Sequence, residues 1–134
     1  MPPIAFLNNE FVPLAEAKVG IMTHALHYGT SAFEGIRGNW NADEGKLYIF
    51  KLKEHYDRLL QGCKVLWINL PYSAEELCSI TVDLIERSGY KEDVYIRPVA
   101  YKSEERVANL NLRELDDGFF CLAIPFGRYL DSEA

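Results

Sequence analysis

Apolar and polar residues alternate along this chain with two different periods, which predict a mixture of helices and strands. In two stretches, 51–66 and 73–88, apolar residues recur at spacings of three and four. That is the period of a helix with one buried face. Around these stretches lie short runs that alternate or are apolar throughout, as is typical of strands. The pattern therefore predicts two main helices set among short strands.

Both helices carry further local signals. The second has a capping-box pattern in Ser73 and Glu76, and Gly89 is expected to end it. Its apolar stripe is formed by Leu77, Ile80 and Leu84. The stripe of the first consists of Leu52, Tyr56, Leu59, Cys63 and Leu66.

The strands are predicted from alternation and from turn residues. Ile4–Leu7 and Glu10–Pro13 flank Asn8-Asn9, which predicts a hairpin. We expect further strands at 33–40, 46–50, 94–101 and 119–124, an extended stretch at 18–22, a turn or a single helical turn at 23–29, and a long polar loop at 103–118. Strands joined by hairpin-length connections, with only two helices, favour an α+β fold with a mainly antiparallel sheet.

Composition excludes several classes of function. The 134 residues fit one domain, and the net charge of −6 without a basic run argues against a nucleic-acid partner. There is no apolar run of membrane-spanning length and no signal-peptide pattern, so we expect a cytoplasmic protein without a membrane partner. The three cysteines are far apart, which favours reduced and mostly buried thiols.

The segment 23–37 has an unusual composition, with two histidines, a tyrosine and an arginine. Read as a strand, its second half places Phe33, Gly35 and Arg37 on one face. A glycine inside a strand indicates close approach of a ligand or another backbone, and the alternative is a bulge or a tight crossing. Both interpretations remain open.

A second arginine suggests anion binding. Arg97 shares a strand face with Tyr95, and a buried guanidinium needs an anion. The alternative is an arginine at the sheet rim, paired with Glu or Asp. Arg58 lies four residues after Glu54 on the first helix, and this spacing by itself indicates an exposed ion pair between the two.

Four motifs, in order along the chain, resemble the branched-chain amino-acid aminotransferases, which are class IV, fold type IV enzymes that use pyridoxal phosphate (PLP). They are THALHYGTSAFEGIR at 23–37, KEHYDRL at 53–59, YIRP at 95–98 and PFGRY at 125–129. The resemblance implies the small N-terminal domain of such an enzyme over 1–124 and the start of an interdomain linker at 125–134. The larger domain, which holds PLP and the catalytic lysine, would lie outside this chain.

The resemblance also implies roles for individual residues. Phe33, Gly35 and Arg37 would line the substrate side-chain pocket, and Arg58 would hold the PLP phosphate. Tyr95 would bind the substrate α-carboxylate and Arg97 the distal carboxylate of glutamate. Further substrate contacts are implied for Tyr28, which would reach the neighbouring subunit's pocket, for Tyr129, for Phe126, which stands where some relatives have tryptophan, and for Val107 in the 103–118 loop.

The lysines bear on catalysis, because transamination needs an amine that binds PLP covalently and moves a proton. The seven lysines all lie among polar or charged neighbours, and we expect each at the surface. None resembles the family's catalytic lysine. We therefore expect no catalytic residue in this chain, no activity from it alone, and no retention of PLP by it. The histidines lack partners at metal-ligand spacing, so no metal site is predicted.

The resemblance implies transfer of the amino group of leucine, isoleucine or valine to 2-oxoglutarate. The partners would be these amino acids, glutamate and 2-oxo acids, and a second copy of the chain in a homodimer or higher homo-oligomer. Two alternatives stay within the same fold type: a D-amino-acid aminotransferase and an aminodeoxychorismate lyase. A third is a non-catalytic binding or dimerisation module.

Overall fold

One antiparallel sheet organises the part of the chain that the computed structural model describes, residues 3–126. Its strand order is β2-β1-β7-β6-β4-β5, with β3 also paired to β6, and every pairing is antiparallel. The strands are β1 (Ile4–Leu7), β2 (Glu10–Pro13), β3 (Ser31–Phe33), β4 (Ile36–Asn41), β5 (Lys46–Ile49), β6 (Val94–Lys102) and β7 (Asp117–Pro125). The predicted α+β fold is confirmed.

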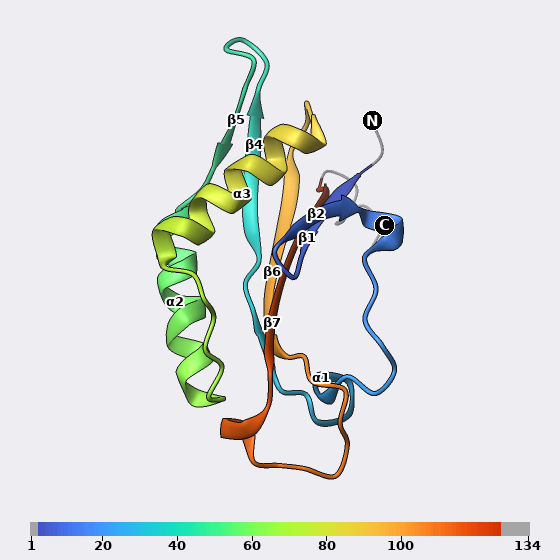
Figure 1. Cartoon of the computed structure of the whole chain (residues 1–134). Helices are drawn as coiled ribbons and strands as arrows, with labels where there is room; N and C mark the ends of the chain where they lie inside the picture. Colours follow the sequence, from blue (N-terminus) through green and yellow to red (C-terminus); the bar gives the residue numbers. More distant parts are fainter. Residues whose placement is uncertain (1–2, 127–134) are drawn as a thin grey trace, which may run out of the picture.

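Two helices, α2 (Leu52–Val65) and α3 (Ala74–Ser88), cover one face of the sheet (Figure 1). The core lies between them and the sheet, where Tyr56, Leu59 and Leu77 of the helices pack with Ile36 and Ile96 of the strands. The 3-10 helix η1 (Leu14–Glu16) and the short helix α1 (His24–Tyr28) lie on the other side of the sheet, and η2 (Leu112–Glu114) lies in the loop before β7. No helix in residues 3–126 is long and apolar enough to cross a membrane.

The local signals in the sequence appear in the structure as expected. Asn8 and Asn9 both adopt positive φ angles, 47° and 73°, which suit the tight turn of the predicted hairpin. Ser73 and Glu76 form both hydrogen bonds of the capping box, and Gly89 ends α3 with φ of 68°.

The strand predicted at 33–40 is instead two strands, β3 and β4, which share one register on β6. Phe33 pairs with Val99 and Ile36 with Ile96, so no residue is inserted between them. The interruption falls opposite Pro98, which has no backbone N–H to donate to the ladder. Between Glu34 and Pro98 one backbone hydrogen bond remains, which the N–H of Glu34 donates to the carbonyl of Pro98 at 3.2 Å.

The stretch 18–22 is also different from the prediction, since it belongs to no strand. It turns at residues 21–22, and the hydroxyl of Thr23 donates to the carbonyl of Gly20 at 2.6 Å. The carboxylate of Glu105 packs directly against Gly20. This turn brings the start of α1 against the 103–118 loop.

Candidate functional site

The face of the sheet away from α2 and α3 collects most of the predicted site residues. Along β6, Val94 and Ile96 point into the core, so Tyr95 and Arg97 lie on the opposite, open face. Arg37 pairs with Tyr95 in the neighbouring strand, and Phe33 pairs with Val99, which places both of them on that face too. Phe33 is 57% exposed there, despite its size.

Gly35 lies on the same face, and its lack of a side chain has a direct cause. A Cβ atom at position 35 would lie 2.9 Å from Cζ of Tyr95 and closer still to its hydroxyl oxygen. The uninterrupted register excludes a bulge. The group that approaches this glycine is the side chain of Tyr95, which the interpretations from the sequence did not include.

Arg97 is held among aromatic rings. Its Nη2 donates to the Tyr95 hydroxyl at 2.6 Å, and its guanidinium carbon lies 4.0 Å from the centre of the Phe33 ring. Its Nε is buried without a hydrogen-bond partner. No carboxylate of residues 3–126 forms an ion pair with Arg97, so it is not the paired rim arginine of the alternative interpretation.

Arg37 and Phe126 extend this arrangement. The guanidinium carbon of Arg37 lies 4.8 Å from the centre of the Phe126 ring. Phe126 in turn stacks on Tyr95, with ring centres 5.6 Å apart and planes at 14°. The open face thus presents two arginines whose charges are supported by aromatic rings, an arrangement suited to a ligand with both a carboxylate and an apolar part.

Arg58 has a different partner from the one expected. Its Nε and Nη2 donate to the two carboxylate oxygens of Glu34, at 2.9 and 2.7 Å, so the alternative pairing with Glu54 is wrong. Nδ1 of His55 also lies 2.7 Å from Glu34. Burial alone would raise the pKa of Glu34, but the hydrogen bonds from Arg58 and His55 outweigh burial and lower the pKa below its ordinary value.

Tyr28 and His24 join α1 to the 103–118 loop. The Tyr28 hydroxyl accepts a bond from the backbone N–H of Ala108 at 2.7 Å, so its partner lies outside its own turn. The ring of His24 is fully buried between the hydroxyl of Thr30, 2.9 Å from Nδ1, and the carbonyl of Asn109, 2.7 Å from Nε2. Sequence reasoning missed this link, because the partners are 85 residues apart and no local pattern connects them.

One lysine contradicts the expectation that all seven are at the surface. Lys102 is 1% exposed, and its ammonium group lies 2.7 Å from both the carbonyl of Trp67 and a carboxylate oxygen of Asp117. Its polar neighbours in the sequence gave no sign of burial, because the chain folds the end of β6 beneath the connection between α2 and α3. The amine of Lys102 is therefore held in an ion pair with Asp117.

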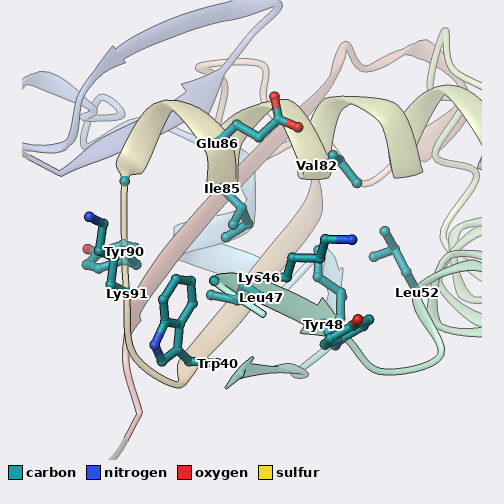
Figure 2. Close-up of a pocket in the computed structure, with 13 residues that line it drawn as sticks. Trp40, Lys46, Leu47, Tyr48, Leu52, Val82, Ile85, Glu86, Tyr90 and Lys91 are labelled. Atoms are coloured by element: carbon teal, nitrogen blue, oxygen red, sulfur yellow. The ribbon is translucent and has the colours of Figure 1, made fainter. Parts of the chain in front are cut away.

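A large hollow on the surface of the molecule does not coincide with the predicted site. It has a volume of about 630 Å³ and lies between α3 and the β4–β5 hairpin, on the helix-covered side. Trp40, Leu47 and Tyr48 face it from the hairpin, and Val82 and Ile85 from α3 (Figure 2). None of the predicted site residues lines it. Its walls are mainly apolar, with Lys46, Lys91 and Glu86 also lining it.

Tyr129 lies outside the described residues. Val107 follows Arg106 in the 103–118 loop and is half-buried. The loop is tied to α1 through the bonds to Tyr28 and His24, so these residues form one unit.

Three comparisons relate this chain to known proteins. The family model of the class IV amino-transferases matches residues 31–129. A probable branched-chain-amino-acid aminotransferase of Aquifex aeolicus is 46% identical over 96% of this chain and 41% of its own length. The chain thus spans about two-fifths of this relative.

Solved structures agree. The branched-chain aminotransferase of Thermoproteus uzoniensis with norvaline is 41% identical over 96% of this chain and 42% of its own, with a TM-score of 0.88. The branched-chain amino acid aminotransferase of Thermobaculum terrenum, in its PLP form, is 31% identical over 97% of this chain and 42% of its own, with a TM-score of 0.82. This chain therefore belongs to the class IV aminotransferases and has the fold of the small domain of the branched-chain enzymes.

Proposed function

We propose that this chain is the substrate-recognition domain of a branched-chain aminotransferase, which transfers the amino group of leucine, isoleucine or valine to 2-oxoglutarate with PLP. The observation that carries the proposal is Arg97, whose buried Nε has no hydrogen-bond partner while its guanidinium group lies between Phe33 and Tyr95. A buried N–H without a partner is costly, so the site favours a ligand that brings a carboxylate to this guanidinium group.

The same face suits both kinds of substrate that such an enzyme must accept. The exposed ring of Phe33 offers an apolar wall to an aliphatic side chain. Arg97 binds the distal carboxylate of glutamate or 2-oxoglutarate through its planar fork. Tyr95 donates its hydroxyl to the α-carboxylate, and Arg37 adds positive charge. Phe126 extends the wall, and a substrate contact remains the prediction for Tyr129.

Arg58 fits one contact to the phosphate of PLP. Its side chain is 72% exposed at the β3 end of the sheet, and two of its nitrogens already bind Glu34. The remaining N–H groups are available to a dianion. When bound, PLP supplies the electron sink for cleavage at the substrate α-carbon. This chain's part is to hold the phosphate at one end and the substrate carboxylates at the other.

The amine that transamination requires comes from outside this chain. Among residues 3–126 the one lysine withdrawn from solvent is Lys102, and its ammonium group is bound to Asp117 and to a backbone carbonyl. We propose that residues 1–124 form the small domain, that 125–134 begin a linker, and that a lysine-bearing domain completes the site. Alone, the chain is inactive and does not retain PLP.

A second copy of the chain is part of the proposal. Several large apolar side chains are exposed in and around α1. The most exposed is Ile21, at 86%, and the others are Val19, Met22, Leu26 and Leu110. An exposed apolar patch of this kind marks an interaction surface. Tyr28 and Val107 lie within the same unit, so a homodimer formed here carries them to the partner's pocket.

The direct test is transamination from leucine to 2-oxoglutarate with added PLP, measured for the 134-residue chain and for the product of the uninterrupted gene. We expect the long product to be active and the 134-residue chain to be inactive. Activity of the purified chain would show that one of its own lysines is catalytic. Preference of the long product for D-alanine over L-leucine would instead favour a D-amino-acid aminotransferase.

A further inference from the structure

Glu34 makes three polar contacts that no part of the proposed function uses. It is 7% exposed, and it accepts Nε and Nη2 of Arg58 while Nδ1 of His55 lies 2.7 Å from the oxygen that binds Nη2. A buried carboxylate is costly unless it is fully hydrogen-bonded, and these bonds meet that requirement. The two partners differ in exposure, because Glu34 is buried whereas the side chain of Arg58 is 72% exposed.

An exposed arginine normally samples many rotamers, and binding an anion then requires that freedom to be lost. Here the two bonds between Arg58 and Glu34 are parallel, one from Nε and one from a terminal nitrogen. This geometry fixes both the position and the plane of the guanidinium group. The edge of the group opposite Glu34 is therefore directed before any ligand arrives.

We propose that Glu34 is a positioning residue, which orients Arg58 so that its outward N–H groups are set for the phosphate of PLP. The proposal rests on the proposed function, in which Arg58 holds that phosphate. Glu34 itself contacts neither cofactor nor substrate. It acts on the cofactor through Arg58 alone.

The position of Glu34 in the chain adds a second consequence. It lies between Phe33 and Gly35, which face the opposite side of the sheet beside Arg97 and Tyr95. The short segment at the interruption between β3 and β4 therefore fixes the proposed phosphate contact on one side and the substrate wall on the other. A shift of this segment changes both together.

The first experiment measures the Arg58 Nε–H by NMR in the 134-residue chain. Held by Glu34, this proton exchanges with solvent more slowly than the Nε–H of Arg113, which makes no ion pair in residues 3–126. The Glu34→Gln variant removes the charge and one acceptor and is expected to raise the exchange rate to that of Arg113. Equal rates in the unmodified chain would overturn the proposal without any variant.

The second experiment uses the product of the whole reading frame and compares the dissociation constants of PLP and of pyridoxal, which lacks the phosphate. Glu34→Gln is expected to raise the dissociation constant of PLP about tenfold and to leave that of pyridoxal unchanged. Tenfold is the lower end of the loss expected when a binding side chain loses the partner that orients it. A purely structural role would weaken both ligands alike. Glu54→Gln, on the same helix as Arg58, is the matched control and is expected to change neither.

Arg58→Gln separates this proposal from the function on which it rests. If Arg58→Gln does not weaken PLP selectively, the phosphate role of Arg58 is wrong and the proposed function loses that contact. If Arg58→Gln does so but Glu34→Gln behaves like Glu54→Gln, the role of Glu34 alone is overturned. Should Glu34→Gln not fold, Glu34→Asp keeps the charge but shortens the side chain, and the same selective loss of PLP is expected.

Discussion

The ring of Tyr95 fills the space in which a side chain at position 35 would begin. Gly35→Ala therefore has to displace the phenol, which also holds Arg97. We expect a loss of about 1–3 kcal/mol in the free energy of unfolding, typical of overpacking, and a higher KM for leucine in the full gene product. Chemical denaturation and steady-state kinetics measure the two effects.

Gly62→Ala is the control for this change. Its added Cβ would meet no atom closer than 3.7 Å, and it lies inside α2. Alanine is the better helix former, so we expect this variant to be more stable by up to about 1 kcal/mol. An equally stable Gly35→Ala would mean that the Tyr95 ring is not tightly held.

Arg97→Gln tests the assignment of the distal carboxylate. A hydrogen bond to a charged group contributes roughly 1.5–3 kcal/mol, so the KM for 2-oxoglutarate should rise about tenfold to a hundredfold while that for leucine changes less. Arg113→Gln removes a guanidinium stacked 4.0 Å from the Trp67 ring, away from the open face, and should change neither constant. Equal effects of Arg97→Gln on both substrates would contradict the assignment.

The buried pair of Lys102 and Asp117 should stabilise the sheet strongly where the end of β6 meets the start of β7. Lys102→Met leaves the Asp117 carboxylate without its counter-charge and with only the Asn69 backbone N–H as a donor, and removal of one member of a buried pair costs about 3–5 kcal/mol. Urea denaturation measures the loss. Lys53→Gln breaks the exposed pair with Asp57 and should cost no more than about 0.5 kcal/mol; similar losses in both variants would mean that burial has no effect here.

The depressed pKa of Glu34 makes stability depend on pH in a defined direction. Because the folded-state pKa lies below the ordinary value of 4.5, the stabilisation is complete above that value and is lost as pH falls through the folded-state pKa. His55 and Arg58 face this carboxylate and keep their bonds to it until it is neutralised. Denaturation at several pH values below 5 should show a steeper loss in the unmodified chain than in Glu34→Gln.

His24→Phe tests the link between α1 and the 103–118 loop. A carbonyl only accepts, so Nε2 of His24 donates to Asn109, and the variant removes this bond and leaves the half-buried carbonyl without it. We expect a cost of about 1–3 kcal/mol and faster amide exchange at Ala108. His27→Phe, which loses an exposed bond to Ile21, should leave that exchange unchanged; protection lost equally in both would argue against a specific role for His24.

Local patterns in the sequence predicted the features that depend on residues close together in the chain. The hairpin at Asn8-Asn9, the capping box at Ser73 and the end of α3 at Gly89 depend on residues within a few positions of one another, and all are present. The alternation through Phe33 and Arg37 placed both residues on one face correctly.

What the sequence did not reveal depends on partners far along the chain. The interruption after Phe33 comes from Pro98 on another strand, and the pairing of Arg58 comes from Glu34, 24 residues before it. The burial of Lys102 is set by a turn beyond α2 and by Asp117 on β7. Periodicity and spacing carry no information about such pairs until the register of the sheet is known.

The interruption between β3 and β4 also limits how the length of this chain can vary. Consecutive side chains at 33, 34 and 35 point to alternate sides, so deleting one residue here would turn Glu34 outward and drive the next large side chain into the core. The turn at 42–45 lies outside any such constraint and can lengthen freely. Insertions and deletions among homologous chains should therefore collect at that turn and be absent from 31–38, where change can come only by substitution.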